Sequence, residues 1–99
     1  EYKAFSKFPA IIRDISLFVP NNTQMIEVTD IIENTAGQLL IDTDLFDMYQ
    51  KLGEDQKSLA FRLVFQSFEK TLTDKEINEI QDKIIKALEE NESWQVRKK

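Results

Sequence analysis

The segment "SLAFRLVF", residues 58–65, constrains the fold more than any other stretch of this chain. Its large apolar side chains recur at every second residue, which is the period at which a β-strand presents side chains to one face. A helix would spread the same residues around its axis, so the segment predicts a strand that is buried on one face only. The expected buried positions are Leu59, Phe61, Leu63 and Phe65, and the opposite positions are Ser58, Ala60, Arg62, Val64 and Gln66.

An earlier segment, "RDISLFVP", alternates in the same way and ends at Pro20, which is followed by two turn-forming asparagines. Its apolar residues Ile15, Leu17 and Val19 are expected to share the buried face with the first segment. A charged pair, Arg13 and Asp14, opens this strand. Such a pair is tolerated if one face of the sheet is open, and Asp14 and Ser16 then lie on that open face.

Two amphipathic helices are predicted between the strands, over about residues 23–36 and 74–91. The first is expected to begin at an Asn22 or Thr23 cap and to end at Gly37, which suits a left-handed residue after a helix. The second begins at a capping box of Thr73 and Glu76. The apolar stripes are Met25, Val28, Ile31, Ile32 and Ala36 in the first helix, and Ile77, Ile80, Ile84 and Leu88 in the second.

Two further strands complete the order. "LLIDTDLFDMYQ" is a strand whose apolar phase slips between Ile41 and Phe46, which indicates a bulge, and "WQVRK" is a short last strand. The order strand, helix, strand, strand, helix, strand predicts an α+β, ferredoxin-like fold. Its antiparallel sheet has the spatial order 4-1-3-2, with both helices on one face. Asp47 and Tyr49 are then expected on the open face beside Arg62.

Composition bounds the function. The 99 residues are expected to form a single domain, residues 1–99, cut from a larger protein. Without histidine or cysteine, the chain has no zinc site, histidine base, thiolate or disulfide. "DTDLFD" is expected to bind no metal, because Phe46 takes a ligand position of a calcium loop and Asp47 replaces its glycine. No apolar run could span a membrane. A net charge of −5 means that any nucleic-acid contact must be local.

Four linked motifs carry a family resemblance. "FPAIIRDISLFV", "LFDMY", "KSLAFRLVFQS" and "KTLTDKEIN", in this order and spacing, resemble the ferredoxin-fold anticodon-binding domain that closes the β subunit of bacterial phenylalanyl-tRNA synthetase. The resemblance covers the chain from about Tyr2 to Arg97. It implies a non-catalytic domain that contacts the anticodon region of tRNA(Phe) from the open sheet face. It also implies a cytoplasmic parent enzyme that pairs with an α subunit as α2β2 and uses ATP and magnesium, with no cofactor in this domain.

Carried over residue by residue, the family's contacting positions are Ser16, Asp47, Tyr49 and Ser58. The strand phases had already placed all four on the open face. Relatives often carry alanine where Ser16 stands, so a hydroxyl adds a possible donor here.

Each site residue has a structural alternative. Tyr49 could stack on an unpaired base, or it could be a half-buried tyrosine at the core edge. Asp47 could accept hydrogen bonds from a base edge, or it could form a cross-strand ion pair with Arg62. Arg62 is a further candidate RNA contact, but a mixed-sign cluster of Arg62, Arg13 and Asp14 would also order the face and prevent sheet-to-sheet association.

Two other functions remain open at this stage. The acidic charge favours a free-standing ferredoxin-like module that binds proteins. "KSLAFRLV" loosely matches the octamer of RNA-recognition motifs, whose aromatic residues face RNA. Here, however, the aromatic phase matches the helix-covered side, so Phe61, Phe65 and Phe68 are expected in the core.

Overall fold

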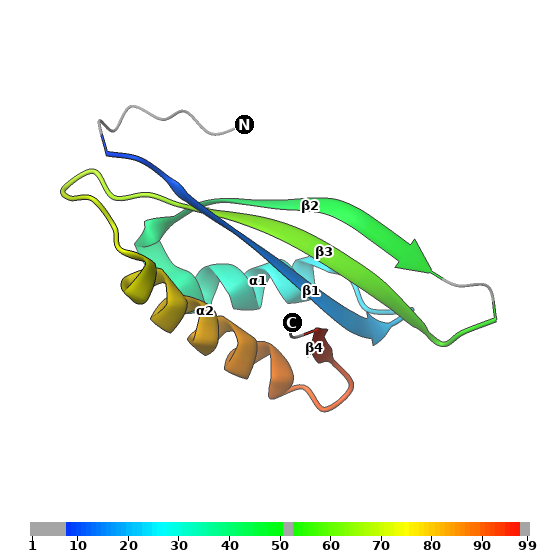
Figure 1. Cartoon of the computed structure of the whole chain (residues 1–99). Helices are drawn as coiled ribbons and strands as arrows, with labels where there is room; N and C mark the ends of the chain where they lie inside the picture. The colour runs from blue at the N-terminus through cyan, green and yellow to red at the C-terminus, as the bar shows by residue number, and fades with distance from the viewer. Residues whose placement is uncertain (1–7, 51–52, 98–99) are drawn as a thin grey trace.

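The alternating segments build one antiparallel sheet, in the order β2-β3-β1-β4, with both helices against one of its faces (Figure 1). The computed structural model describes residues 8–50 and 53–97. This arrangement confirms the predicted ferredoxin-like α+β fold and the 4-1-3-2 strand order. The elements are β1 (Ile11–Pro20), α1 (Met25–Ala36), a 3₁₀ turn (Gly37–Leu39), β2 (Leu40–Gln50), β3 (Gln56–Phe65), α2 (Asp74–Glu89) and β4 (Gln95–Arg97).

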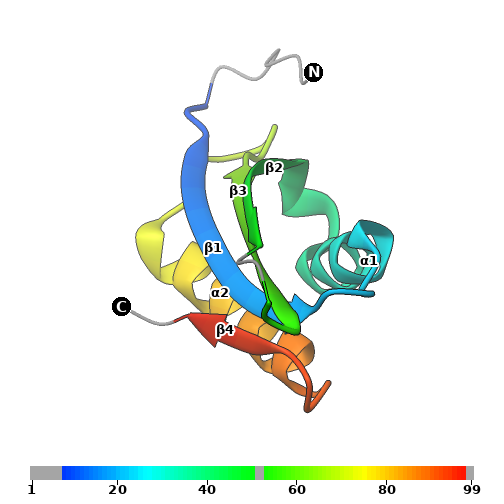
Figure 2. The ribbon, with the colours of Figure 1, turned by 90° about the vertical axis from the view of Figure 1, so that its right-hand side faces the viewer.

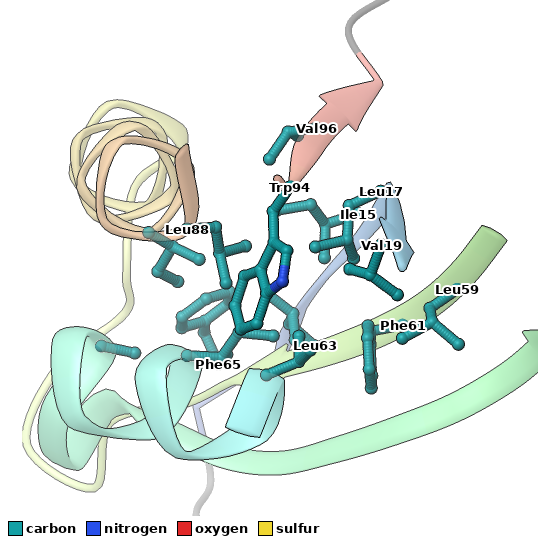
Figure 3. Packing of buried hydrophobic residues seen from close by; sticks show 14 of the residues in the cluster. Ile15, Leu17, Val19, Leu59, Phe61, Leu63, Phe65, Leu88, Trp94 and Val96 are labelled. Atoms are coloured by element: carbon teal, nitrogen blue, oxygen red, sulfur yellow. The ribbon is translucent and has the colours of Figure 1, made fainter. Parts of the chain in front are cut away.

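The core fills the space between the sheet and the helices, and the predicted strand phases are confirmed there. All seven apolar residues assigned to the buried face of β1 and β3 are at most 4% exposed. Trp94, just before β4, is 6% exposed, and its indole points into the same cluster (Figure 3). Burial of a large apolar side chain contributes about 1.5–3 kcal/mol, so this cluster is a main source of the stability of the fold.

The helices begin and end close to their expected positions, with one correction. The N-cap of α1 is Gln24 rather than Asn22 or Thr23, and the Glu27 carboxylate accepts a hydrogen bond from the Gln24 backbone N–H at 2.8 Å. Thr23 is instead buried. Gly37 follows α1 with φ 75° and ψ −151°, which lies outside the left-handed helical region that was expected, and glycine adopts this positive φ without a Cβ clash.

The capping of α2 is confirmed in part. Thr73 Oγ1 accepts a hydrogen bond from the Glu76 N–H at 3.2 Å, as expected of an N-cap. The Glu76 carboxylate does not complete the box, because it pairs with Lys70 at 3.0 Å. The predicted apolar stripes of both helices face the core, except that Met25 is 44% exposed.

The short β4 closes one edge of the sheet. It follows directly from the end of α2 and lies beside β1, where it pairs with Ser16, Leu17 and Phe18 (Figure 2). At the other edge, the β2–β3 hairpin reaches past the ends of the helices (Figure 1). Within the described ranges, neither helix has the length and apolar character needed to cross a membrane.

Candidate nucleic-acid interface

The face of the sheet away from the helices carries side chains in register across all four strands. Residues directly opposite each other in an antiparallel pair point to the same face, so the pairing defines rows. We call this surface the open face and name three of its rows. The charged row is Asp44, Arg62 and Asp14; the middle row is Asp47, Ala60, Ser16 and Arg97; the aromatic row is Tyr49, Ser58, Phe18 and Gln95.

A bulge in β2 decides which of its residues reach the open face. The register with β3 shifts between Leu45 and Asp47, which leaves Phe46 as an extra residue. Because side chains alternate between faces, an insertion of one residue reverses the direction of every later side chain. Without the bulge, Asp47 and Tyr49 would point toward the helices. A second shift, at Ile41, confirms that the slip in apolar phase marked real irregularities.

Tyr49 and Ser58 lie opposite each other in the aromatic row. The Tyr49 side chain is 62% exposed, so the alternative of a half-buried tyrosine at the core edge is wrong. Ser58 is partly buried between its neighbours. The phenol ring is therefore accessible to a ligand, and the small serine beside it leaves room on the sheet surface.

The middle row brings Asp47 and Ser16 onto the same line across the sheet, with Ala60 between them. Asp47 is exposed and Ser16 is partly buried. A carboxylate and a hydroxyl separated by a methyl group leave a shallow floor with an acceptor at one side and a donor at the other. All four residues carried over from the family resemblance thus lie in two adjacent rows.

Arg62 lies in the charged row and forms its ion pair with Asp14, not with Asp47. Its Nε is 3.2 Å from Asp14 Oδ1, and its guanidinium carbon lies 4.7 Å from the centroid of the Phe46 ring. The alternative of an Asp47–Arg62 ion pair is wrong, because the register places Asp44 opposite Arg62. With both partners about half exposed, the pair contributes at most about 1 kcal/mol to stability.

Arg13 does not belong to this cluster. Its Nη2 lies 3.3 Å from Asp74 Oδ1 and 3.3 Å from Asn78 Oδ1, at the start of α2. The expectation that Arg13 would help to order the open face is wrong, because Arg13 and Asp14 are consecutive in a strand and point to opposite sides. Arg13 instead fastens β1 to α2 at the rim of the core.

The open face ends before the last residues of β3. Val64 and Gln66 have the open-face phase, but they are only 4% and 3% exposed. Gln66 Nε2 donates a hydrogen bond to the Phe8 carbonyl at 2.6 Å, which ties the segment before β1 to this end of the sheet. The accessible part of the face is therefore centred on the three named rows.

The aromatic residues of β3 do not face a ligand. Phe61 and Phe65 are fully buried, as expected, so the reading of this strand as an RNA-recognition octamer is wrong. Phe68 was expected in the core but is 60% exposed. Phe68 lies past Phe65, where the strand ends, and is out of phase with the buried positions of β3.

The sequence that forms this one-sided sheet matches a known protein family. The family described as the ferredoxin-fold anticodon binding domain matches residues 6–97. The chain belongs to this family. The match covers nearly all of the sequence and includes the strands that carry all three rows of the open face.

Individual relatives agree with this membership. The phenylalanine–tRNA ligase beta subunit of Clostridium tetani is 39% identical over 99 residues, which cover 98% of this chain and 12% of that protein. The beta subunit of Moorella thermoacetica is 42% identical over 91 residues, covering 90% of this chain and 11% of the relative. That of Bacillus cereus strain ZK is 37% identical over 99 residues. The chain thus spans about an eighth of the length of these relatives.

Sequence reasoning missed two side chains of the aromatic row, Phe18 and Gln95. The alternation in "RDISLFVP" does put Phe18 on the open face, and that signal was available. Gln95 depends on which residues of β4 pair with β1, and a three-residue strand carries too little pattern to determine its register.

Proposed function

We propose that this domain binds the anticodon region of tRNA(Phe) through its open face. The observation that carries the proposal is the meeting of Ser16, Asp47, Tyr49 and Ser58 in two adjacent rows, in a chain that belongs to an anticodon-binding family. A tRNA anticodon presents unstacked bases, and single-stranded RNA of this kind is recognised by stacking and by hydrogen bonds to base edges.

The middle row and the aromatic row provide different kinds of contact with the bases. Tyr49 supplies a ring on which a base stacks, and this contact tolerates any base because every base has a π-face. Asp47 supplies acceptors only, so it favours guanine, whose Watson–Crick edge presents two N–H donors. Ser58, in the adjacent row of β3, and Ser16, across Ala60 in β1, add hydroxyl groups beside that position. An aspartate is a poor phosphate ligand, so specificity rather than charge explains its presence.

The electrostatics of the face fit a local contact. Asp14, Asp44 and Asp47 on the open face outnumber Arg62 and Arg97 among its described residues. The chain carries a net charge of −5, so it cannot gain much affinity from releasing counterions. The domain therefore contributes recognition, and most of the binding energy for a whole tRNA comes from other contacts through tethering.

The parent protein in this proposal is the β subunit of a cytoplasmic phenylalanine–tRNA ligase, assembled with an α subunit as α2β2. The domain itself performs no chemistry. We place the ATP and magnesium of that reaction on other parts of the parent protein.

A titration of labelled tRNA(Phe) with the 99-residue chain at two salt concentrations tests the proposal. We expect a dissociation constant near or weaker than about 10⁻⁵ M, which is the range of contacts without strong electrostatics. We also expect tighter binding to tRNA(Phe) than to a tRNA with another anticodon. Equal binding to both tRNAs would contradict anticodon recognition, and nanomolar binding would contradict the local contact inferred from the charge.

A further inference from the structure

The aromatic row contains a hollow that extends beyond the residues carried over from the family. The hollow is about 410 Å³ and is lined by Phe18, Tyr49, Glu54, Gln56, Ser58 and Gln95. Tyr49 and Phe18 belong to β2 and β1, and Ser58 of β3 lies between them in the register. Two aromatic side chains thus flank one small residue, on the same face of the sheet.

The spacing of these strands suits a planar ring. Strands lie about 4.8 Å apart, so the backbones of Tyr49 and Phe18 are about 9.5 Å apart. Centroids of stacked rings lie about 4.5–7 Å apart, so a ring stacked on both sides needs about 9–14 Å between its two neighbours. Rings that stand upright over these two strands would therefore be separated by a distance at the tight end of this range. A side chain larger than serine at position 58 would fill the gap.

Arg97 holds Phe18 from the other side. Its guanidinium carbon lies 5.6 Å from the centroid of the Phe18 ring, a cation–π distance. Phe18 also lines a second hollow with Glu89, Gln95, Val96 and Arg97. The ring therefore stands between Arg97 on one side and the space beside Tyr49 on the other. Arg97 acts as a positioning residue, because it restricts the Phe18 ring without lining the first hollow.

The polar groups around the hollow suit an uncharged ligand with a hydrogen-bonding edge. Gln56 and Gln95 provide amide donors and acceptors, and Ser58 provides a hydroxyl. Among the described lining residues, Glu54 alone carries a formal charge, and it is negative. The turn that carries it is fastened by Asn21, whose Nδ2 donates to the Glu54 carbonyl at 2.8 Å. A phosphate would find no cation among these lining residues, whereas a nucleobase would find hydrogen-bond partners for its edge.

We infer that Phe18 and Tyr49 form a two-sided clamp that holds a single base of the RNA in the hollow, with Gln95 and Gln56 at its edge. This inference rests on the proposed RNA-binding function and adds to it a second stacking wall and a base-edge contact from β4. Phe18 is thereby a specificity-determining residue, because a base held on both faces must fit the width of the gap.

Fluorescence of 2-aminopurine tests the clamp. Hairpins with the anticodon stem-loop sequence of tRNA(Phe) carry 2-aminopurine at one loop position each, and the 99-residue chain is added to concentrations well above about 10⁻⁵ M. We expect quenching at one position, which both Phe18→Leu and Tyr49→Ala reduce at that same position. Each variant should weaken binding about five- to 150-fold, and their effects should be non-additive because both rings contact the same base. Phe18→Trp should retain the quenching.

The controls separate the clamp from the proposed function. Phe68→Leu alters an exposed aromatic residue beyond the opposite end of β3 and should leave the quenching unchanged. If the wild-type chain binds no hairpin, the proposed function fails. If it binds and Phe18→Leu retains full affinity and quenching, or the two variants act at different positions, the clamp alone is refuted. Should Phe18→Leu unfold, NMR of the wild-type chain decides, because unchanged Phe18 ring resonances on addition of RNA refute the clamp.

Discussion

Truncation of Tyr49 to alanine removes an aromatic ring that is 62% exposed and lies across from Ser58 on the open face. Because most of the ring is already in water, the loss of buried surface is small. The free energy of unfolding should change by no more than about 0.5 kcal/mol, as for most surface substitutions. Any larger effect on RNA binding must then come from the lost contact with the ligand.

The expected loss of binding follows from base stacking. One stacked base contributes about 1–3 kcal/mol by alanine substitution, which corresponds to a five- to 150-fold weaker dissociation constant. Tyr49→Phe retains the ring and should lose much less, since the hydroxyl does not provide the stacking surface. The slope of log K against log salt should stay the same in both variants, because neither removes a phosphate contact.

The assay is a titration of labelled tRNA(Phe) at two salt concentrations, with thermal unfolding of each variant followed by circular dichroism. A parallel measurement of aminoacylation kcat/KM in the complete ligase reports the same loss where the isolated chain binds too weakly. If Tyr49→Ala folds normally and binds and supports charging as well as wild type does, the open face is not the anticodon site. A melted variant would instead show that the ring is structural.

Three further predictions concern other residues. Asp47→Asn should reduce discrimination between anticodons more than it reduces total binding, because an amide offers a donor where a guanine edge needs an acceptor. Competition between cognate and non-cognate tRNA measures this discrimination, and unchanged selectivity would contradict the prediction. Phe61→Ala should lower the free energy of unfolding by about 3–5 kcal/mol in chemical denaturation, since the ring is fully buried, and a loss below about 1 kcal/mol would contradict the face assignment. Thr73→Ala should cost about 1 kcal/mol by the same measurement, through loss of the 3.2 Å cap to Glu76; no loss would show that the cap is redundant.

The fold could be predicted from the sequence because its signals are local. The alternation around Phe61 and that around Leu17 each define a buried face within a few residues, and both faces are buried as predicted. Thr73 and Gly37 mark helix boundaries through contacts with their own neighbours in the chain. Hydrophobic periodicity and helix capping depend only on nearby residues, so these predictions based on them were confirmed without knowledge of the rest of the protein.

Predictions failed where a residue was assigned by its type without regard to its position in the strand or its packing. Phe68 was assigned to the core together with Phe61 and Phe65, but it lies past the end of β3 and out of phase with their buried positions. The cap of α1 was placed on Thr23, a good capping residue, but that side chain is buried and Gln24 begins the helix. Propensity ranks the candidates for such a position, and packing selects among them.

For the candidate site, too, some features could be predicted from the sequence and others required the tertiary structure. The phases of their strands alone determined that Ser16 and Ser58 share the open face. For Asp47 and Tyr49 the sequence predicted the same face and indicated a bulge, and the position of that bulge at Phe46 in the structure decides their direction. Only the tertiary structure decided which side chains meet across strands: Arg62 with Asp14 instead of Asp47, and Phe18 with Tyr49 around the hollow. These pairings depend on register between segments far apart in the chain, and register is set by the packing of the whole sheet against its helices.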